Sequence, residues 1–118
     1  MIEKDDRTYI LHILDCIDAI EIFSKNIKKE TLLTNREKKS AIIREIEIIG
    51  EATKNISKEL KDKNPNVQWK LIVGTRDKMI HHYFGVDVNI VWEIIKNEIP
   101  LLKKQIIKIK KDLLRIVQ

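Results

Sequence analysis

Proline, glycine, cysteine and aromatic residues are all scarce in this chain of 118 residues. It has 2 Pro, 3 Gly and 1 Cys, and aromatic side chains make up 5%. Few turn formers and few aromatics disfavour a β-rich fold, and Cys16 alone cannot form an internal disulfide. No apolar run approaches the roughly 20 residues of a membrane span, and the first residues lack the apolar stretch of a signal peptide. We therefore expect one helical domain over residues 1–118, cytoplasmic and not associated with a membrane.

Charge is plentiful and slightly unbalanced. Charged residues make up 35% of the chain, and 23 Lys and Arg against 18 Asp and Glu leave a formal charge of +5. A basic chain suits a polyanionic partner, although the acidic residues break up the positive field. The charge therefore permits nucleic-acid binding without demonstrating it.

Apolar residues recur at helical spacing along most of the chain, which predicts an all-α bundle of four or five up-and-down helices. The first helix should run from Asp5 to about Lys28, capped by Asp5 or Asp6. The second should run from a capping box of Thr34 and Glu37 to about Lys61. The third should cover about Gln68 to Phe84 and stop at Gly85, and the fourth should begin after the cap Asp87. Pro100 should either kink that helix or lie in the first turn of a fifth, after a break near Asn97.

Gly50 is expected in the middle of the second helix, where it costs roughly 1 kcal/mol relative to Ala. A close crossing with another helix would explain a glycine there. The apolar arc around Gly50 is also wider than one neighbouring helix needs, so part of it is a candidate contact with a second chain.

The inventory of reactive residues excludes several classes of enzyme. The three histidines and Cys16 form no recognisable transition-metal motif, so we expect no metal and no cofactor. The isolated glycines cannot form a phosphate-binding loop of the kind that ATPases and dehydrogenases use. Cys16 lies in the apolar stripe of the first helix, as a small buried thiol would, and His12 lies off that stripe and should be solvated.

One dense cluster remains, residues 74–85, which holds an arginine, two histidines, an aspartate and a tyrosine near the end of the third helix. The simpler interpretation is a polar outer face with aromatic residues closing the core. The functional interpretation is that His81 exchanges protons near neutral pH and Arg76 grips a phosphate, as metal-free RNA cleavage requires. In that reaction the RNA 2′-hydroxyl is the nucleophile.

Helical geometry distinguishes the residues of this cluster. His81 lies about 140° around the helix from Arg76 and about 7.5 Å further along its axis, so the two cannot pair directly without a neighbouring chain or long side-chain reach. Asp77 precedes His81 by four residues and could accept a hydrogen bond from its ring, whereas Lys78 precedes His82 by four and disfavours its protonation. His81 is therefore the better acid–base candidate.

Arg76, His81 and Tyr83 form the pattern R-x4-H-x-Y. Together with Gly85-Val86-Asp87 and the earlier block Ile49-Gly50-Glu51-Ala52, this pattern resembles the HepT-like branch of the HEPN superfamily over nearly the whole chain. The resemblance implies an all-helical homodimer whose R-x4-H residues, from both subunits, line a cleft at the interface. It implies Arg76 and His81 as catalytic residues and Asp77 as a supporting one, and it gives His82 no role.

Similar proteins are metal-independent ribonuclease toxins of type VII toxin–antitoxin pairs. Their partner is a minimal nucleotidyltransferase antitoxin, which transfers AMP from ATP to the motif tyrosine, here Tyr83. The resemblance therefore implies RNA as substrate, this antitoxin as partner, and a homodimer that can join it in a hetero-oligomer.

Two other functions fit the same sequence. The chain could be a noncatalytic nucleotide- or substrate-binding subunit of a nucleotidyltransferase. It could also be a basic helical bundle that binds nucleic acid without cutting it, in which case binding would depend on salt and not on His81.

Overall fold

The computed structural model describes the backbone of residues 4–81 and 87–117 and the side chains of residues 6–77 and 87–115. Seven α-helices and one π-helix make up the secondary structure of this part of the chain, which contains no strand. They are α1 (Lys4–Phe23), α2 (Lys29–Thr34), α3 (Arg36–Lys54), α4 (Lys58–Lys63), α5 (Trp69–His81), α6 (Val88–Glu93), the π-helix η1 (Ile94–Glu98) and α7 (Ile99–Val117). The predicted all-α fold is confirmed.

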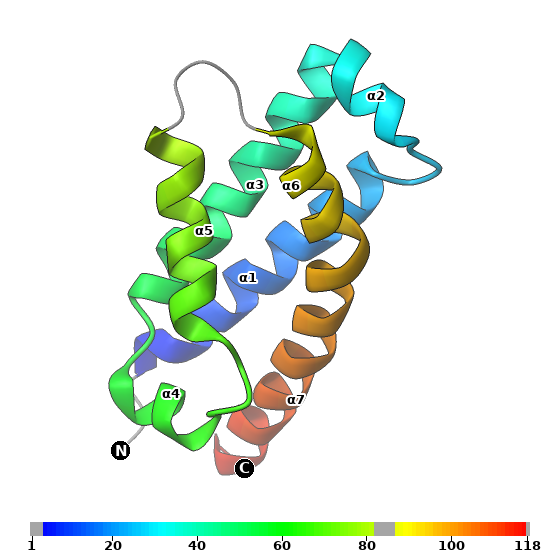
Figure 1. Ribbon diagram of the computed structural model, residues 1–118. Coiled ribbons are helices and arrows are strands. Elements are labelled where there is room, and N and C mark those ends of the chain that lie inside the picture. The colour runs from blue at the N-terminus through cyan, green and yellow to red at the C-terminus, as the bar shows by residue number, and fades with distance from the viewer. Residues whose placement is uncertain (1–3, 82–86, 118) are drawn as a thin grey trace.

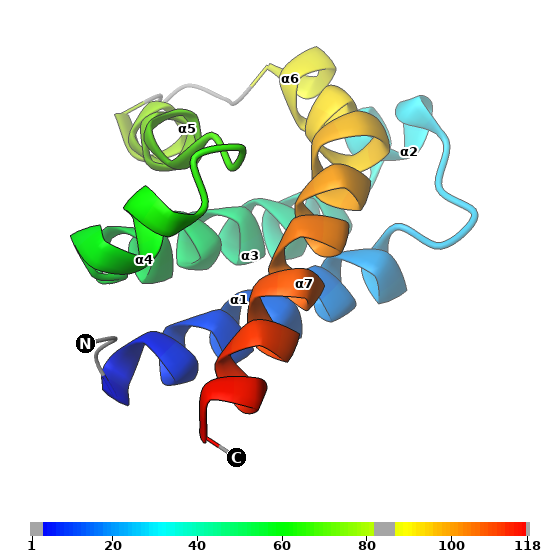
Figure 2. The ribbon, with the colours of Figure 1, turned by 90° about the horizontal axis from the view of Figure 1, so that it is seen from below.

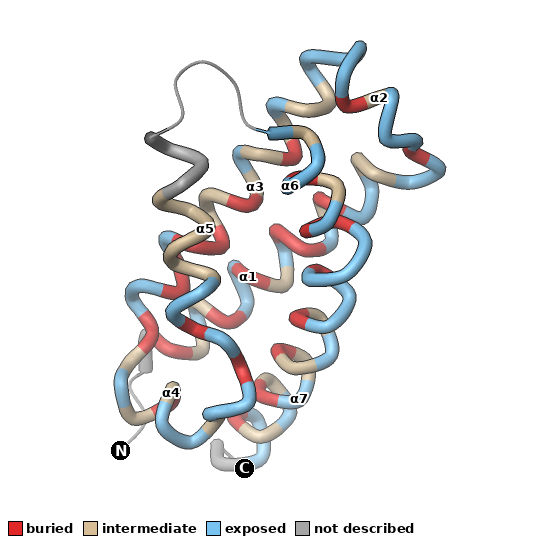
Figure 3. Tube along the Cα trace, in the orientation of Figure 1, coloured by how far each residue is buried: buried red, intermediate tan, exposed pale blue. Residues whose placement is uncertain are grey.

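Four long helical segments run up and down, and α6, η1 and α7 follow one another without a break as the fourth (Figure 1). Helix α3 packs against α1 on one side and α5 on the other, and α7 packs across α1 (Figure 2). Buried residues recur along α1, α3 and α7, whereas residues 72–77 of α5 are only half-buried (Figure 3). Helix α5, which carries the candidate site, is therefore the least covered of the long helices.

The predicted stripes of apolar residues form the core. Ile13, Cys16 and Ile20 of α1 are buried, as expected, and so are Ile42, Ile46 and Ile49 of α3. The four-three spacing in α7 also faces inward, with Leu102, Ile106, Ile109 and Leu113 buried. Hydrophobic periodicity therefore located the inner faces of α1, α3 and α7. It failed at Leu71 of α5 and Ile90 of α6, which were predicted to be buried and are 49% and 45% exposed.

Asp6 does not cap the first helix, contrary to the prediction. Helix α1 already includes Asp5 and Asp6, and the buried carboxylate of Asp6 accepts hydrogen bonds from the backbone N and the Oγ of Ser57, at 2.8 and 2.6 Å. Ser57 in turn caps α4, because its Oγ accepts a hydrogen bond from Leu60 N at 3.2 Å. The start of α1 is thus tied to a helix about fifty residues later in the chain.

Three predicted helix boundaries were wrong because local capping groups end the helices sooner. Helix α1 ends at Phe23 rather than Lys28, and Asn26 follows with a left-handed φ of 59°. The predicted helix from Thr34 to Lys61 is two helices, separated at residues 55–57. Thr34 does not cap it: Thr34 ends the short α2, and Asn35 caps α3 by accepting a hydrogen bond from Lys38 N at 2.9 Å.

Pro100 causes neither of the predicted effects in full. No break occurs near Asn97. Instead the π-helix η1 precedes the proline, and Ile99 N donates a hydrogen bond to Ile94 O across this wider turn. Pro100 has no N–H to donate, so a local widening of the helix lets the chain continue past it. The predicted cap Asp87 is confirmed, since it accepts a hydrogen bond from Asn89 N at 2.8 Å, whereas the predicted stop at Gly85 lies outside the described residues.

Candidate functional site

Gly50 of α3 lies directly against Arg76 of α5. A Cβ added to Gly50 would meet the Cβ of Arg76 and lie 2.6 Å from its Cγ, closer than real Cβ contacts. The predicted close crossing at Gly50 is therefore confirmed, and the residue on the other side of it is the predicted phosphate-binding arginine. The absence of a side chain at Gly50 lets the stem of Arg76 rest on the α3 backbone.

The guanidinium of Arg76 is held by two carboxylates. Its Nη2 lies 3.0 Å from Oε2 of Glu51, and its Nη1 lies 3.2 Å from Oδ1 of Asp77. The Arg76 side chain is 23% exposed, while those of Glu51 and Asp77 are 55% and 48% exposed. The arginine is thus partly sunk between α3 and α5, and the carboxylates that hold it remain in contact with water.

The Nε of Arg76 is buried and has no hydrogen-bond partner in the described part of the chain. A guanidinium has five N–H groups, and the two ion pairs need only one on each terminal nitrogen. An anion can therefore bind Arg76 through its remaining N–H groups, but two negative charges flank its approach. The local charge of these three side chains is −1, so an anion must either approach from the unoccupied edge or displace a carboxylate.

Asp77 pairs with Arg76, whereas the sequence pointed mainly to a hydrogen bond with the ring of His81. Residues one apart on a helix seldom face each other, and the length of the arginine side chain makes this contact possible. His81 is the last residue of α5, so Arg76 and His81 do share one helix, but the His81 side chain lies outside the described residues. The bond between Asp77 and His81 stays a prediction. His82 and Tyr83 also lie outside the described residues.

Sequence reasoning missed the role of Glu51. It stood in the block that resembles the HepT-like family, but no function followed from its spacing. The signal was available in its position after Gly50, because the residue next to a close helix crossing is well placed to reach a side chain of the opposite helix.

The other reactive side chains behave as simple structural groups. Cys16 is buried, and burial together with a hydrogen bond to Glu45 raises its pKa to about 12, so it stays protonated at neutral pH. His12 is exposed, as predicted. Among the side chains that can be placed, no three His, Cys, Asp or Glu gather in a way that could hold a metal ion.

None of the described helices is both long enough and apolar enough to cross a membrane.

The architecture and the crossing of Gly50 with Arg76 define a small all-helical domain of the HEPN type, with a half-buried arginine on its third long helix. Comparison with known proteins agrees with this class. The ribonuclease HepT-like family matches residues 13–109, so the chain belongs to the HepT-like ribonuclease family.

Several relatives are similar over almost their whole length. "Putative RNase MJ1216" of Methanocaldococcus jannaschii is 43% identical over 96% of this chain and 93% of its own. "Putative RNase TTE0752" of Caldanaerobacter subterraneus is 45% identical over 87% of this chain and 92% of its own. "Probable ribonuclease HepT" of Thermococcus cleftensis is 39% identical over 92% of this chain and 99% of its own. No solved structure gave a significant match.

Proposed function

We propose that this chain is a metal-independent endoribonuclease toxin of a type VII toxin–antitoxin system, acting in the cytoplasm. The observation that carries the proposal is the placement of Arg76. In a family of ribonucleases, the arginine of the R-x4-H pattern is half-buried at a helix crossing, held by carboxylates and on the same helix as His81. A cation held in a fixed orientation suits the binding of one phosphate.

In the proposed reaction, the 2′-hydroxyl oxygen of a ribose attacks the adjacent phosphorus. The bond from phosphorus to the 5′-oxygen of the next nucleotide breaks, which leaves a 2′,3′-cyclic phosphate. His81 takes the proton of the 2′-hydroxyl as a general base or supplies a proton to the departing 5′-oxygen as a general acid. Arg76 stabilises the charge that develops on the phosphate oxygens, and Asp77 supports this site by holding Arg76.

The proposal includes a homodimer. On one helix Arg76 and His81 diverge by about 140°, and a second subunit would let one copy of each residue reach the same phosphate. One feature supports an interface at α5: Val73, Arg76 and Asp77 are only half-buried in the described part of the chain. A partner seated there would cover the apolar part of this surface.

Control by adenylylation completes the proposal. A minimal nucleotidyltransferase antitoxin would join the phenolic oxygen of Tyr83 to the α-phosphate of ATP and release pyrophosphate. The AMP group adds negative charge and bulk two residues from His81, which would keep an RNA phosphate away. In this scheme the antitoxin and the homodimer form a hetero-oligomer during transfer.

The decisive experiment is cleavage of RNA by the purified protein in EDTA. We expect the wild type to cut RNA and Arg76→Ala and His81→Ala to lose at least about a hundredfold in rate, the scale of acid–base catalysis. Lys70→Ala is the matched control, since Lys70 is an exposed cation on α5 outside the site. Intact RNA at every protein concentration would overturn the nuclease and leave the noncatalytic binding subunit as the function.

A further inference from the structure

A groove lies between α3, α5 and the junction of η1 with α7, with a volume of about 110 Å³ and one side open to solvent. Its floor and walls are aliphatic, formed mainly by Ile46, Ile49, Ile72, Ile94, Ile99 and Leu102. A cavity of about 150 Å³ can hold a benzene ring. The groove is smaller than this but open on one side, so it can receive only part of a planar ring system, and the rest would project into water.

The groove adjoins the seat of Arg76. On α3, the groove residue Ile49 is followed by Gly50, on which Arg76 packs. On α5, the groove residue Thr75 is followed by Arg76 itself. On both helices, therefore, a groove residue is the direct sequence neighbour of Arg76 or of the glycine on which Arg76 packs. A nucleotide whose phosphate is held by Arg76 would have its base close to the groove.

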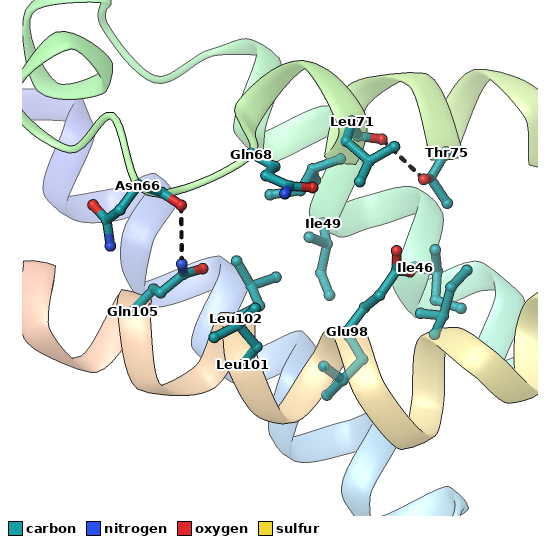
Figure 4. Close-up of a pocket in the computed structure, with 13 residues that line it drawn as sticks. Ile46, Ile49, Asn66, Gln68, Leu71, Thr75, Glu98, Leu101, Leu102 and Gln105 are labelled. Atoms are coloured by element: carbon teal, nitrogen blue, oxygen red, sulfur yellow. Dashed lines mark hydrogen bonds between the residues drawn. The ribbon is translucent and has the colours of Figure 1, made fainter.

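Polar side chains from several elements also line the groove. Figure 4 shows Glu98 reaching from η1 into the space between the helices, and Gln68 reaching into it from the start of α5. Thr75 Oγ1 already donates to Leu71 O at 2.9 Å, and Gln105 Nε2 already donates to Asn66 O at 3.2 Å. Thr75 can therefore offer the groove only an acceptor, whereas Gln105 keeps one free N–H as well as its carbonyl oxygen.

Glu98 is exposed, and its carboxylate lines the groove without a partner within the described residues. Burial first, and the Glu93 carboxylate second, raise the pKa of Glu98. A carboxylate at the wall of an aliphatic groove can accept charge-assisted hydrogen bonds from a ligand whose ring lies in the groove. Its two oxygens match two adjacent N–H donors best.

We infer that this groove binds an unpaired guanine of the RNA, next to the phosphate held by Arg76, with the guanine edge on Glu98 and its ring faces on the isoleucines. Guanine is the base that presents two neighbouring donors, N1–H and the N2 amino group, on its Watson–Crick edge, whereas the other bases present one donor there. Single-stranded RNA is commonly recognised in this way, by a splayed base that is covered on its faces and read along its edge. This inference rests on the proposed ribonuclease function and adds its base preference.

The test compares RNA oligonucleotides that differ only at the nucleotides flanking the cut. We expect the wild type to prefer guanine on one side of the scissile phosphate by about tenfold, the discrimination of one two-point hydrogen bond. Replacing that guanine by inosine, which lacks the N2 amino group, should lower the rate. Glu98→Gln should remove the preference between guanine and inosine while still cutting both.

Glu47→Gln is the matched control, because Glu47 is a carboxylate of α3 that does not line the groove. Cleavage without a preference for guanine, unchanged in Glu98→Gln, would overturn the inference and leave the nuclease standing. If groove variants such as Leu101→Asp instead change only the oligomeric state in sedimentation, the groove is a contact between two copies and the inference is wrong.

A binding measurement decides the inference even if no RNA is cut. Guanosine monophosphate, titrated into protein with labelled isoleucine methyl groups, should shift the groove signals, and adenosine monophosphate should do so about tenfold more weakly. The reporters are Ile46, Ile49, Ile72, Ile94 and Ile99, and the control is Ile13 of the core. Equal shifts with both nucleotides, or none, would refute a guanine site independently of the nuclease.

Discussion

The carboxylate of Glu51 lies 3.0 Å from Nη2 of Arg76, and the residue before Glu51 is the glycine on which Arg76 packs. Two consecutive residues of α3 thus supply the space for the arginine stem and the charge that orients its guanidinium. The five predictions that follow test this arrangement, the tie between Asp6 and Ser57, the modification of Tyr83 and the protonation of Cys16.

Gly50→Ala should destabilise the protein by about 1–3 kcal/mol, because the new methyl group collides with Arg76 in a packed crossing. This loss would occur although alanine is the better helix former. Gly74→Ala is the control, since a Cβ at Gly74 meets nothing within 4 Å, and it should stabilise by up to about 1 kcal/mol. Urea unfolding measures both. If both substitutions change the free energy of unfolding equally, the close contact between Gly50 and Arg76 does not affect stability.

Glu51→Gln should separate binding from catalysis. It removes a negative charge beside the proposed phosphate site and loosens the hold on Arg76, so KM for RNA should fall while kcat drops about tenfold. The free energy of unfolding should change by less than about 1 kcal/mol, as expected for an exposed ion pair. Glu47→Gln, one turn earlier on α3, should leave both kinetic constants unchanged. If Glu51→Gln lowers the free energy of unfolding as well as kcat, the role of Glu51 is structural only.

Asp6→Ala should cost about 1–3 kcal/mol, because it leaves the partly buried backbone N–H and hydroxyl of Ser57 without their acceptor. Ser57→Ala should cost a similar amount, and the double variant should lose less than the sum of the two. Asp15→Ala, an exposed aspartate of α1, serves as control and should not destabilise. Thermal or urea unfolding measures the cycle, and additive losses would contradict a direct coupling.

Tyr83 should accept AMP from the proposed antitoxin. Coexpression with the transferase should add the mass of AMP to the wild type and to Tyr9→Phe, and none to Tyr83→Phe. The chain has only 2 Tyr, so these variants cover every tyrosine acceptor. Mass spectrometry of the intact protein gives the readout, and unchanged modification of Tyr83→Phe would reject this site.

Cys16 should react slowly with alkylating reagents at pH 8, because its pKa is raised from 9.0 to about 12 by burial. We expect the folded protein to react about a hundredfold or more slowly than the same protein in denaturant, since the thiolate is the reactive form. The unfolded thiol ionises near pH 9 and the folded one near 12, so stability should fall as pH rises between these values. Cys16→Ala should show a shallower decline in urea unfolding. Rapid alkylation of the native protein would contradict a buried thiol.

The inner faces of α1, α3 and α7 were predictable because the period of the apolar residues follows burial. On α5 the same argument failed, since Leu71 was predicted to be buried and is 49% exposed. The crossing at Gly50 was predictable too, because a glycine inside a helix has a cost that packing must offset. The helix ends were harder, since Thr34 and Asn35 are both good caps and the local sequence does not decide between them. Asp6 with Ser57, and Arg76 with Glu51, depend on contacts between distant segments, which no local pattern encodes.

The π-helix at Ile94–Glu98 keeps the apolar face of α6 aligned with the apolar face of α7. Buried residues recur at Val91, Ile95 and Ile99, two steps of four residues, before the alternation of three and four resumes in α7. Eight residues of regular α-helix would leave Ile99 turned about 80° from Val91. The wider turn absorbs the surplus residue, since seven residues of regular helix would bring Ile99 within about 20° of Val91. Deletion of one residue from η1 should therefore leave regular α-helix in its place, with α7 in its present orientation and Leu101, now 57% exposed, still facing outward.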